Sequence, residues 1–214
     1  MITKKECIAV FLAILLMSFL LVFNNFQLDI NHLLKFFVIS FIIVLVSVIA
    51  KKITASNIDV EAEIKIWEFR RYWFYKQSYL KSPLPMGMLL PLLFAFFSGG
   101  IIKFMTFLQF NATALPSKVV KKYGVRRISG IMEWDDALIG FYSTLALLVL
   151  ASVCSFINVA SFPFAEFAKY SLYYALYNLI PFSPLDGAKI FFGSRPLYIF
   201  TLVISGISAL IVLL

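Results

Sequence analysis

Six long apolar runs constrain this chain more than any other feature. They cover about residues 7 to 23, 33 to 50, 85 to 107, 137 to 158, 165 to 183 and 196 to 214. A helix of about 20 apolar residues crosses the hydrocarbon core of a bilayer, which is about 30 Å thick. With 62% hydrophobic and 14% charged residues, the chain lies far outside the average of soluble domains. The runs therefore predict an all-α polytopic membrane protein that forms a single membrane domain over residues 1–214.

The positions of Lys and Arg predict how the chain is oriented. The 19 Lys and Arg exceed the 11 Asp and Glu, for a net charge of +8. The basic residues gather beside the first run and on both sides of the run 85–107, whereas residues 24–32 and 159–164 contain none. The positive-inside rule then places the N-terminus in the cytoplasm of a multi-pass protein of the cell membrane. Basic loops of this kind suit anionic lipid, so the lipid bilayer is the expected partner and nucleic acid is not.

The run 85–107 is the exception to a simple series of crossings. Basic segments flank it on both sides, which a single crossing cannot satisfy. Ser98-Gly99-Gly100 lies in its middle, where glycine makes a break in the helix sterically cheap. We interpret 85–107 as a re-entrant hairpin dipping from the cytoplasmic face, which leaves five spans and puts the C-terminus outside. The alternative is an ordinary sixth crossing that overrides the charge bias.

Strand-like patterns occur between the apolar runs. Apolar and charged residues alternate with a period of two over 58–66, which predicts a half-buried strand. Together with candidate strands further on, it predicts a small cytoplasmic-face β element over about 57–68 and 107–131. Residues 67–73 combine aromatic and basic side chains and are interpreted as an anchor at the membrane interface.

One carboxylate, Asp186, lies in a stretch rich in Pro and Gly at the end of the fifth run. The stretch reads Asn178-Leu-Ile-Pro181-Phe-Ser-Pro184-Leu-Asp186-Gly187. Proline ends a helix by removing an amide donor, and glycine supplies backbone freedom beside the carboxylate. An ionisable residue inside a membrane protein is costly and by default marks a candidate functional site.

This stretch resembles the second signature of the site-2 protease family of intramembrane zinc metalloproteases. In that family the aspartate is the third zinc ligand, and a second glycine usually follows where this chain has Ala188. The resemblance covers most of residues 33–200 and implies a site-2 protease-like transmembrane core. Family members also need His-Glu-x-x-His on a helix, where two imidazoles hold zinc and the glutamate acts as general base.

The histidine half of that zinc site is missing from the sequence. The chain has one histidine, His32, so two histidine ligands within it are impossible. The family pattern would place Ser47 at the first histidine, Val48 at the glutamate and Lys51 at the second histidine. Asp186 alone cannot hold catalytic zinc, so we expect no metal, no other cofactor and no catalytic residue. The expected remnants of the family site are Ser47, Val48, Lys51, Asn178, Pro181, Pro184, Asp186 and Gly187.

A scaffold signature without its metal ligands predicts a pseudoprotease. Such a protein is not an enzyme and binds transmembrane segments or partner membrane proteins without cutting them. Two alternatives stay open. Ser47 and Lys51, four residues apart on a helix, could serve as nucleophile and base of an active hydrolase with non-zinc chemistry. A membrane aspartate beside a re-entrant run also suits a transporter or channel subunit.

Two contacts are predicted around these residues. In the family scaffold the second histidine position and the aspartate meet at one ion, so Lys51 should pair with Asp186 and neutralise it. The alternative is that Lys51 and Lys52 extend to the cytoplasmic surface as an ordinary basic helix end. The strand at 58–66 should offer an edge to an extended partner segment, unless it only covers the helices.

Overall fold

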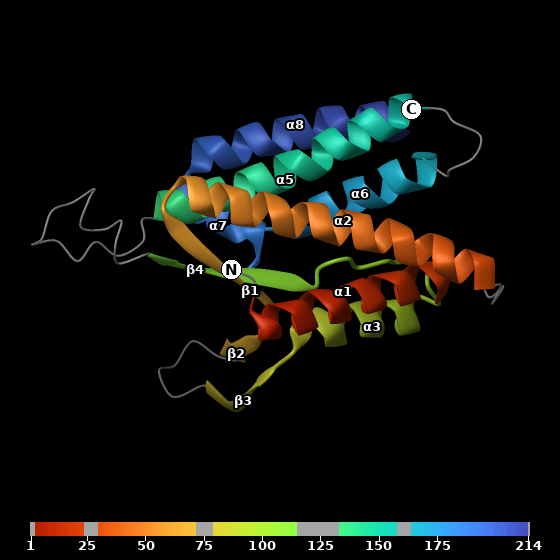
Figure 1. Cartoon of the computed structure of the whole chain (residues 1–214), viewed down its shortest axis with the longest axis horizontal. Coiled ribbons are helices and arrows are strands. Elements are labelled where there is room, and N and C mark those ends of the chain that lie inside the picture. The colour runs from red at the N-terminus through yellow and green to blue at the C-terminus, as the bar shows by residue number, and fades with distance from the viewer. Residues whose placement is uncertain (1–2, 24–29, 72–78, 115–132, 158–163, 214) are drawn as a thin grey trace, which may run out of the picture. The chain divides into compact units, whose positions relative to one another are not determined.

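The computed structural model describes residues 3–23, 30–71, 79–114, 133–157 and 164–213, most of them helical. The chain divides into two compact units, Met1–Val44 with Ile64–Gln109 (unit 1) and Leu45–Glu63 with Phe110–Leu214 (unit 2). The described elements, drawn in Figure 1, are α1 (Lys4–Phe23), α2 (Ile30–Asn57), β1 (Val60–Ile66), β2 (Phe69–Arg71), β3 (Tyr79–Leu84), α3 (Met86–Phe97), β4 (Leu108–Ala114), α5 (Glu133–Phe156), α6 (Phe164–Asn178), α7 (Asp186–Gly193) and α8 (Arg195–Leu213).

Four of the described helices, α1, α2, α5 and α8, are long and apolar enough to cross a membrane. The fifth predicted span, 165–183, corresponds to the 15-residue helix α6, which ends at Asn178, before the predicted end. At 1.5 Å per residue α6 is about 22 Å long, shorter than a bilayer core of about 30 Å. The reason for its early end is Pro181, which lacks an amide donor and disfavours helical geometry at Ile180 before it.

The segment 85–107 in unit 1 begins with a short helix, and its second half is not helical. Helix α3 is followed by Gly99 and Gly100, which have φ angles of 61° and 86°, and the chain then runs to β4 without further helix. The Gly87 amide donates to the Trp67 carbonyl at 2.9 Å, and the Trp67 amide donates to the Phe107 carbonyl at 2.8 Å. Both ends of the segment therefore meet at one residue. Its entry into a membrane stays a prediction.

The β structure consists of two small two-stranded sheets, β1 with β4 and β2 with β3. The first agrees with the predicted β element up to residue 114, and the rest of that element, 115–132, lies outside the described residues. The second sheet was not predicted: Phe69–Arg71 forms a strand antiparallel to β3. Of the segment 67–73, interpreted as an anchor at the membrane interface, residues 72 and 73 lie outside the described residues, and an interfacial place for Phe69–Arg71 stays a prediction. Trp67, which precedes β2, is 2% exposed and is a core residue of unit 1, not a surface anchor.

In unit 2, helix α5 packs against α6, α7 and α8. Serine hydroxyls join these helices: Ser171 donates to the Leu147 carbonyl at 3.0 Å, and the hydroxyls of Ser152 and Ser208 lie 3.0 Å apart. At Gly193 an added Cβ would lie 2.3 Å from the Glu133 carbonyl oxygen, so only glycine allows α7 to approach the start of α5 this closely. Small residues and serines at helix contacts are typical of membrane helix packing.

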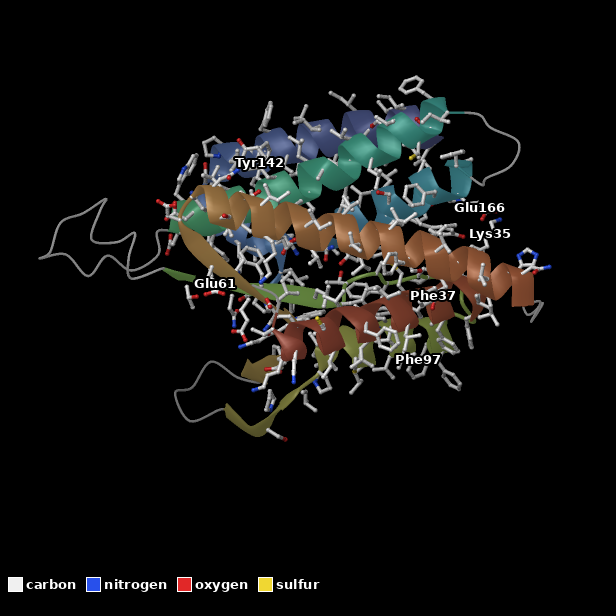
Figure 2. All side chains as sticks on the ribbon, viewed as in Figure 1. Lys35, Phe37, Glu61, Phe97, Tyr142 and Glu166 are labelled. Carbon is white, nitrogen blue, oxygen red and sulfur yellow. The ribbon has the colours of Figure 1, made fainter. Side chains whose placement is uncertain are left out.

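Large apolar side chains remain on the outside of both units. Phe97 in unit 1 is 83% exposed and Tyr142 in unit 2 is 49% exposed, and Figure 2 shows both on the ribbon. Aromatic and aliphatic residues on the surfaces of α1, α2, α3 and α8 add to them. Extended apolar surfaces are unusual on soluble monomers and suit contact with lipid. Together with the four long apolar helices, they indicate a membrane-associated protein.

Candidate functional site

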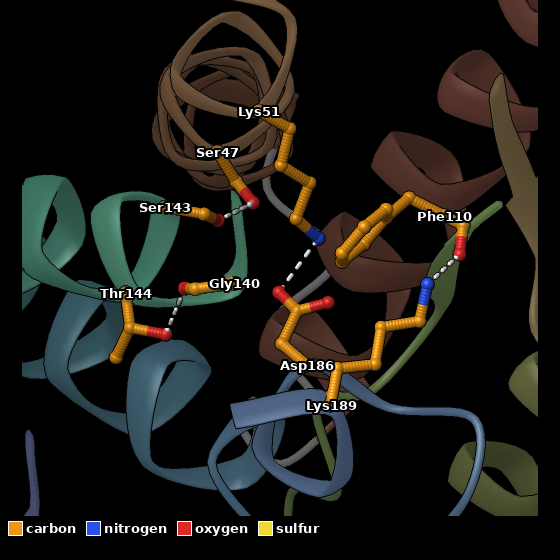
Figure 3. A network of polar contacts seen from close by, with 8 residues as sticks. All are labelled: Ser47, Lys51, Phe110, Gly140, Ser143, Thr144, Asp186 and Lys189. Carbon is orange, nitrogen blue, oxygen red and sulfur yellow. Dashed lines mark hydrogen bonds and ion pairs between the residues drawn. The ribbon is translucent and has the colours of Figure 1, made fainter. Parts of the chain in front are cut away.

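A buried ion pair forms the centre of the candidate site in unit 2. The Lys51 Nζ lies 2.7 Å from Asp186 Oδ2, and each side chain is 2% exposed. Figure 3 shows the lysine reaching from α2 toward the first residue of α7. The predicted contact between Lys51 and Asp186 is confirmed, and the alternative in which Lys51 extends to the surface is wrong. At this length the contact is a charge-assisted hydrogen bond as well as an ion pair.

Two glycines allow the close backbone contacts around Asp186. An added Cβ at Gly187 would lie 2.0 Å from the Leu179 carbonyl oxygen, which lets the start of α7 fold back on the end of α6. At Gly140 on α5, an added Cβ would lie 3.2 Å from the Asp186 carbonyl oxygen. Asp186 is also in the first turn of α7, where the partial positive charge of a helix start favours a carboxylate.

The other two candidate residues on α2, Ser47 and Val48, are also buried. Ser47 is 1% exposed, and its hydroxyl lies 3.3 Å from that of Ser143 on α5. Val48 is 8% exposed and offers no polar group. Within the described part of the chain, the Ser47 hydroxyl contacts that of Ser143, the Lys51 amine bonds Asp186, and no hydrogen bond is found between Ser47 and Lys51. This arrangement does not assemble the nucleophile and base of the hydrolase alternative.

The remaining signature residues surround the turn before Asp186. Asn178 is the last residue of α6 and is 2% exposed. Pro181 and Pro184 lie in the connection between α6 and α7; Pro181 is exposed, and the Ser183–Pro184 peptide bond is cis. The structure thus brings Asn178, Asp186 and Gly187 into the interior with Lys51, while Pro181 only shapes the turn.

A second cation, Lys189, lies near this pair and was not singled out from the sequence. Its Nζ donates to the Phe110 carbonyl oxygen and lies 3.6 Å from Asp136 Oδ2. The same ammonium lies 3.4 Å from the centre of the Phe110 ring, and that of Lys51 lies 5.5 Å from it. Burial lowers the pKa of Lys189, and the negative charge of Asp136 opposes that shift. The signal in the sequence was the spacing of Asp186 and Lys189, three apart on one helix.

Charged side chains also bind the strands at their outer edges. Directly after β1, the Trp67 amide donates to the carbonyl of Phe107, which directly precedes β4, and backbone groups alternate between the two edges along a strand. Ile64 and Phe110, three residues further along, therefore point their backbone groups to the outer edges. In unit 1 the Ile64 amide donates to Glu6 Oε1 at 2.9 Å, and in unit 2 the Phe110 carbonyl accepts from Lys189. The predicted edge at 58–66 is thus already occupied at Ile64.

The fold and the site together define a class: a mostly helical protein with four described helices able to cross a membrane and a buried lysine–aspartate pair. No protein-family model, curated protein or solved structure matches the chain. Among the residues that the structure describes, no three His, Cys, Asp or Glu side chains gather closely enough to hold a metal ion.

Proposed function

We propose that this chain is a non-catalytic, site-2 protease-like membrane protein that binds transmembrane segments or partner membrane proteins. The observation that carries the proposal is the 2.7 Å contact between Lys51 and Asp186. The sequence resemblance assigns these two positions to ligands of one zinc ion. In this chain the ammonium supplies the positive charge that the carboxylate needs, so the interior stays neutral without a metal.

The chemistry of the surrounding residues supports binding over cleavage. A zinc protease needs two histidines and a glutamate base, and the chain has Ser47, Val48 and a single histidine in all. Val48 can neither accept nor donate a proton. Around the pair, Gly187 and Gly140 let α7 pack closely against the end of α6 and against α5. A scaffold signature in the sequence without proton-transfer groups fits a protein that holds a segment without cutting it.

Two measurements test the proposal. The first is the zinc content of the purified chain in lipid, measured by elemental analysis, which should be far below one equivalent and should not change in Asp186→Asn. The second is photo-crosslinking in native membranes from Glu61, which is exposed on β1, with Val203 on α8, 55% exposed, as the control position. Captured proteins specific to Glu61 should contain a transmembrane segment and be recovered at full length.

One equivalent of tightly bound zinc, or capture of partner fragments cut within a transmembrane segment, would overturn the proposal. The orientation is tested separately with single cysteines labelled from outside the cell. A cysteine at position 121, which lies outside the described residues, should remain unlabelled if 85–107 re-enters from the cytoplasmic face. Labelling there would establish a crossing by 85–107 and leave the binding function to be judged by the crosslinks.

A further inference from the structure

The turn that ends α3 in unit 1 exposes large apolar side chains and carries no charge. Residues 86–102 contain no Lys, Arg, Asp or Glu. Leu89 and Leu92, nearer the base of the segment, are 40% and 39% exposed, whereas Phe97 and Ile101 at the turn are 83% and 81% exposed. Among the described large apolar side chains of unit 1, those at the turn are the most exposed.

The backbone of this turn satisfies its own amide donors. The Gly100 amide donates to the Ala95 carbonyl at 2.8 Å. The Gly99 amide donates to the Phe96 carbonyl at 3.3 Å. Together these bonds form a Schellman motif, in which a residue with positive φ, here Gly99, ends the helix.

Ser98 satisfies the rest of the turn. Its amide donates to the Phe94 carbonyl at 3.0 Å, and the Ile101 amide donates to the Ser98 carbonyl at 3.3 Å. The Ser98 hydroxyl donates to the Phe94 carbonyl at 2.6 Å and accepts the Ile102 amide at 3.0 Å. Every backbone amide of residues 98–102 therefore has an acceptor within the segment. Water would supply acceptors to a surface turn, whereas hydrocarbon cannot.

The shape of α3 favours lipid over a protein groove as its surroundings. Its buried residues, Gly87, Pro91 and Ala95, are four apart and form one narrow stripe, and α1 packs against α3 in the same unit. The rest of the helix surface carries leucine and phenylalanine side chains. A groove would cover one face of the helix, whereas acyl chains can surround all of this apolar surface.

The length of α3 matches one leaflet. With 12 residues it is about 18 Å long, and half of a bilayer core measures about 15 Å. Gly87 and Phe107 both bond the backbone of Trp67, so a segment that enters the membrane there must return to the same face. Lys103, the first charged residue after the turn, is half-buried and has an interaction partner, as charged residues at membrane depth usually do.

We propose that the turn at 96–102 inserts into the acyl chains of one leaflet and reaches about the middle of the bilayer, with Ser98 closing the turn. The charges around 85–107 predicted only the face from which the segment enters. The hydrogen bonds and exposure add the depth of its tip, its lipid surroundings and a role for Ser98. This inference goes beyond the proposed function and does not depend on partner binding.

Spin labels on the full chain in phosphatidylcholine vesicles test the insertion. Single cysteines at positions 97 and 101, in a background with Cys7→Ser and Cys154→Ser, carry a nitroxide whose collisions with oxygen and with a water-soluble nickel chelate are measured. Oxygen concentrates in hydrocarbon and the chelate stays in water. Position 89 near the start of α3 is the matched control, and position 203 near the middle of α8 is the reference for a lipid-facing site in a long apolar helix.

The ratio of oxygen to nickel collisions should be several-fold higher at positions 97 and 101 than at 89, and similar to that at 203. Frequent nickel collisions at 97 and 101 would place the turn in water, and rare collisions with both reagents would place it against protein. Either result would overturn the insertion.

A second comparison tests Ser98. In Ser98→Ala the Ile102 amide loses its acceptor and favours water, so the ratio at position 97 should fall several-fold. Ser98→Thr keeps a hydroxyl and should preserve the ratio. An unchanged ratio in Ser98→Ala would overturn the role of Ser98. The labels on the chain with Ser98 intact decide the insertion even if Ser98→Ala fails to fold.

Discussion

Two carboxylates are buried to the same extent in the two units and are satisfied in different ways. Glu6 in unit 1 and Asp186 in unit 2 are each 2% exposed. Glu6 accepts backbone amides with both oxygens, from Ile64 at 2.9 Å and from Thr3 at 2.7 Å. Asp186 accepts the ammonium of Lys51 with one oxygen, and its other oxygen has no partner among the described residues.

The difference separates a structural carboxylate from a functional candidate. The Glu6 carboxylate is bound by backbone amides that are fixed once α1 and β1 have formed. The Thr3 hydroxyl in turn accepts a hydrogen bond from the Glu6 amide, so that Thr3 and Glu6 form a capping box at the start of α1. The Asp186 carboxylate depends on one long side chain and keeps an open oxygen. A group of the second kind can exchange its partner for another donor or cation. Burial alone therefore does not identify a functional carboxylate, but the nature of its partners does.

The largest effect should follow from removing the ammonium. Lys51→Met leaves Asp186 charged and buried without its partner, which should lower the free energy of unfolding by about 3–5 kcal/mol. The measurement is reversible unfolding in mixed lipid and detergent micelles. Lys51→Met combined with Asp186→Leu should recover much of the loss, because no charge then remains to be neutralised. Additive losses in this double-mutant cycle would show that the two side chains are not energetically coupled.

A smaller loss is expected from crowding the backbone beside Asp186. Gly187→Ala places a methyl group 2.0 Å from the Leu179 carbonyl oxygen, so the turn must shift, at a cost of roughly 3 kcal/mol. Gly206→Ala on α8 is the matched control, since no atom beyond its chain neighbours and its own helix backbone lies within 4 Å of the new methyl. The same unfolding assay compares them. Equal stability of the two variants would mean that the turn before Asp186 tolerates movement and does not fix the carboxylate.

Removing the structural carboxylate should cost less than removing the ammonium at the candidate site. Glu6→Ala leaves the buried Ile64 amide unpaired and removes the side-chain part of the α1 start, for a loss of about 2 kcal/mol. Hydrogen exchange should locate the loss, with faster exchange at the Ile64 amide and at the first turn of α1. Unchanged exchange at Ile64 would contradict the assignment of Glu6 as its partner.

The smallest effect should come from a neutral contact beside the ion pair. Ser143→Ala removes the hydroxyl 3.3 Å from that of Ser47, and hydrogen bonds between membrane helices contribute on average about 0.6 kcal/mol. Stability measured in the same micelles should therefore change little. A loss as large as that of Lys51→Met would mean that Ser47 and Ser143 belong to the charged network.

The sequence predicted the parts of the molecule that rest on strong local patterns. The apolar runs marked α1, α2, α5 and α8, and the alternation over 58–66 marked β1. The contact between Lys51 and Asp186 was also predicted, although 134 positions separate the two (186 − 51 − 1). A resemblance at both positions carried that prediction, since no spacing rule connects residues so far apart.

Other parts lacked such a pattern. Helix α7 has only 8 residues and follows a turn with two prolines, so its periodicity is too short to recognise. The aromatic and basic residues around β2 suit a membrane interface as well as a strand, and the strand forms through tertiary pairing with β3, which no local pattern specifies. The sequence contains a signal for the capping role of Glu6, because Thr3-x-x-Glu6 is a helix-start signature. The hydrogen bond from the Ile64 amide to Glu6 forms only on folding and has no such signal.

The double attachment at Trp67 has a consequence for how the chain could be shortened or extended. Gly87 and Phe107 are both hydrogen-bonded to its backbone, so the residues between them form a loop that is closed at its base. The entropy of closing a loop changes slowly with its length, by about 0.6 kcal/mol for each doubling. The base can therefore hold loops of different length at little cost. Segment 85–107 could therefore change in length during evolution without disturbing the strands next to its base.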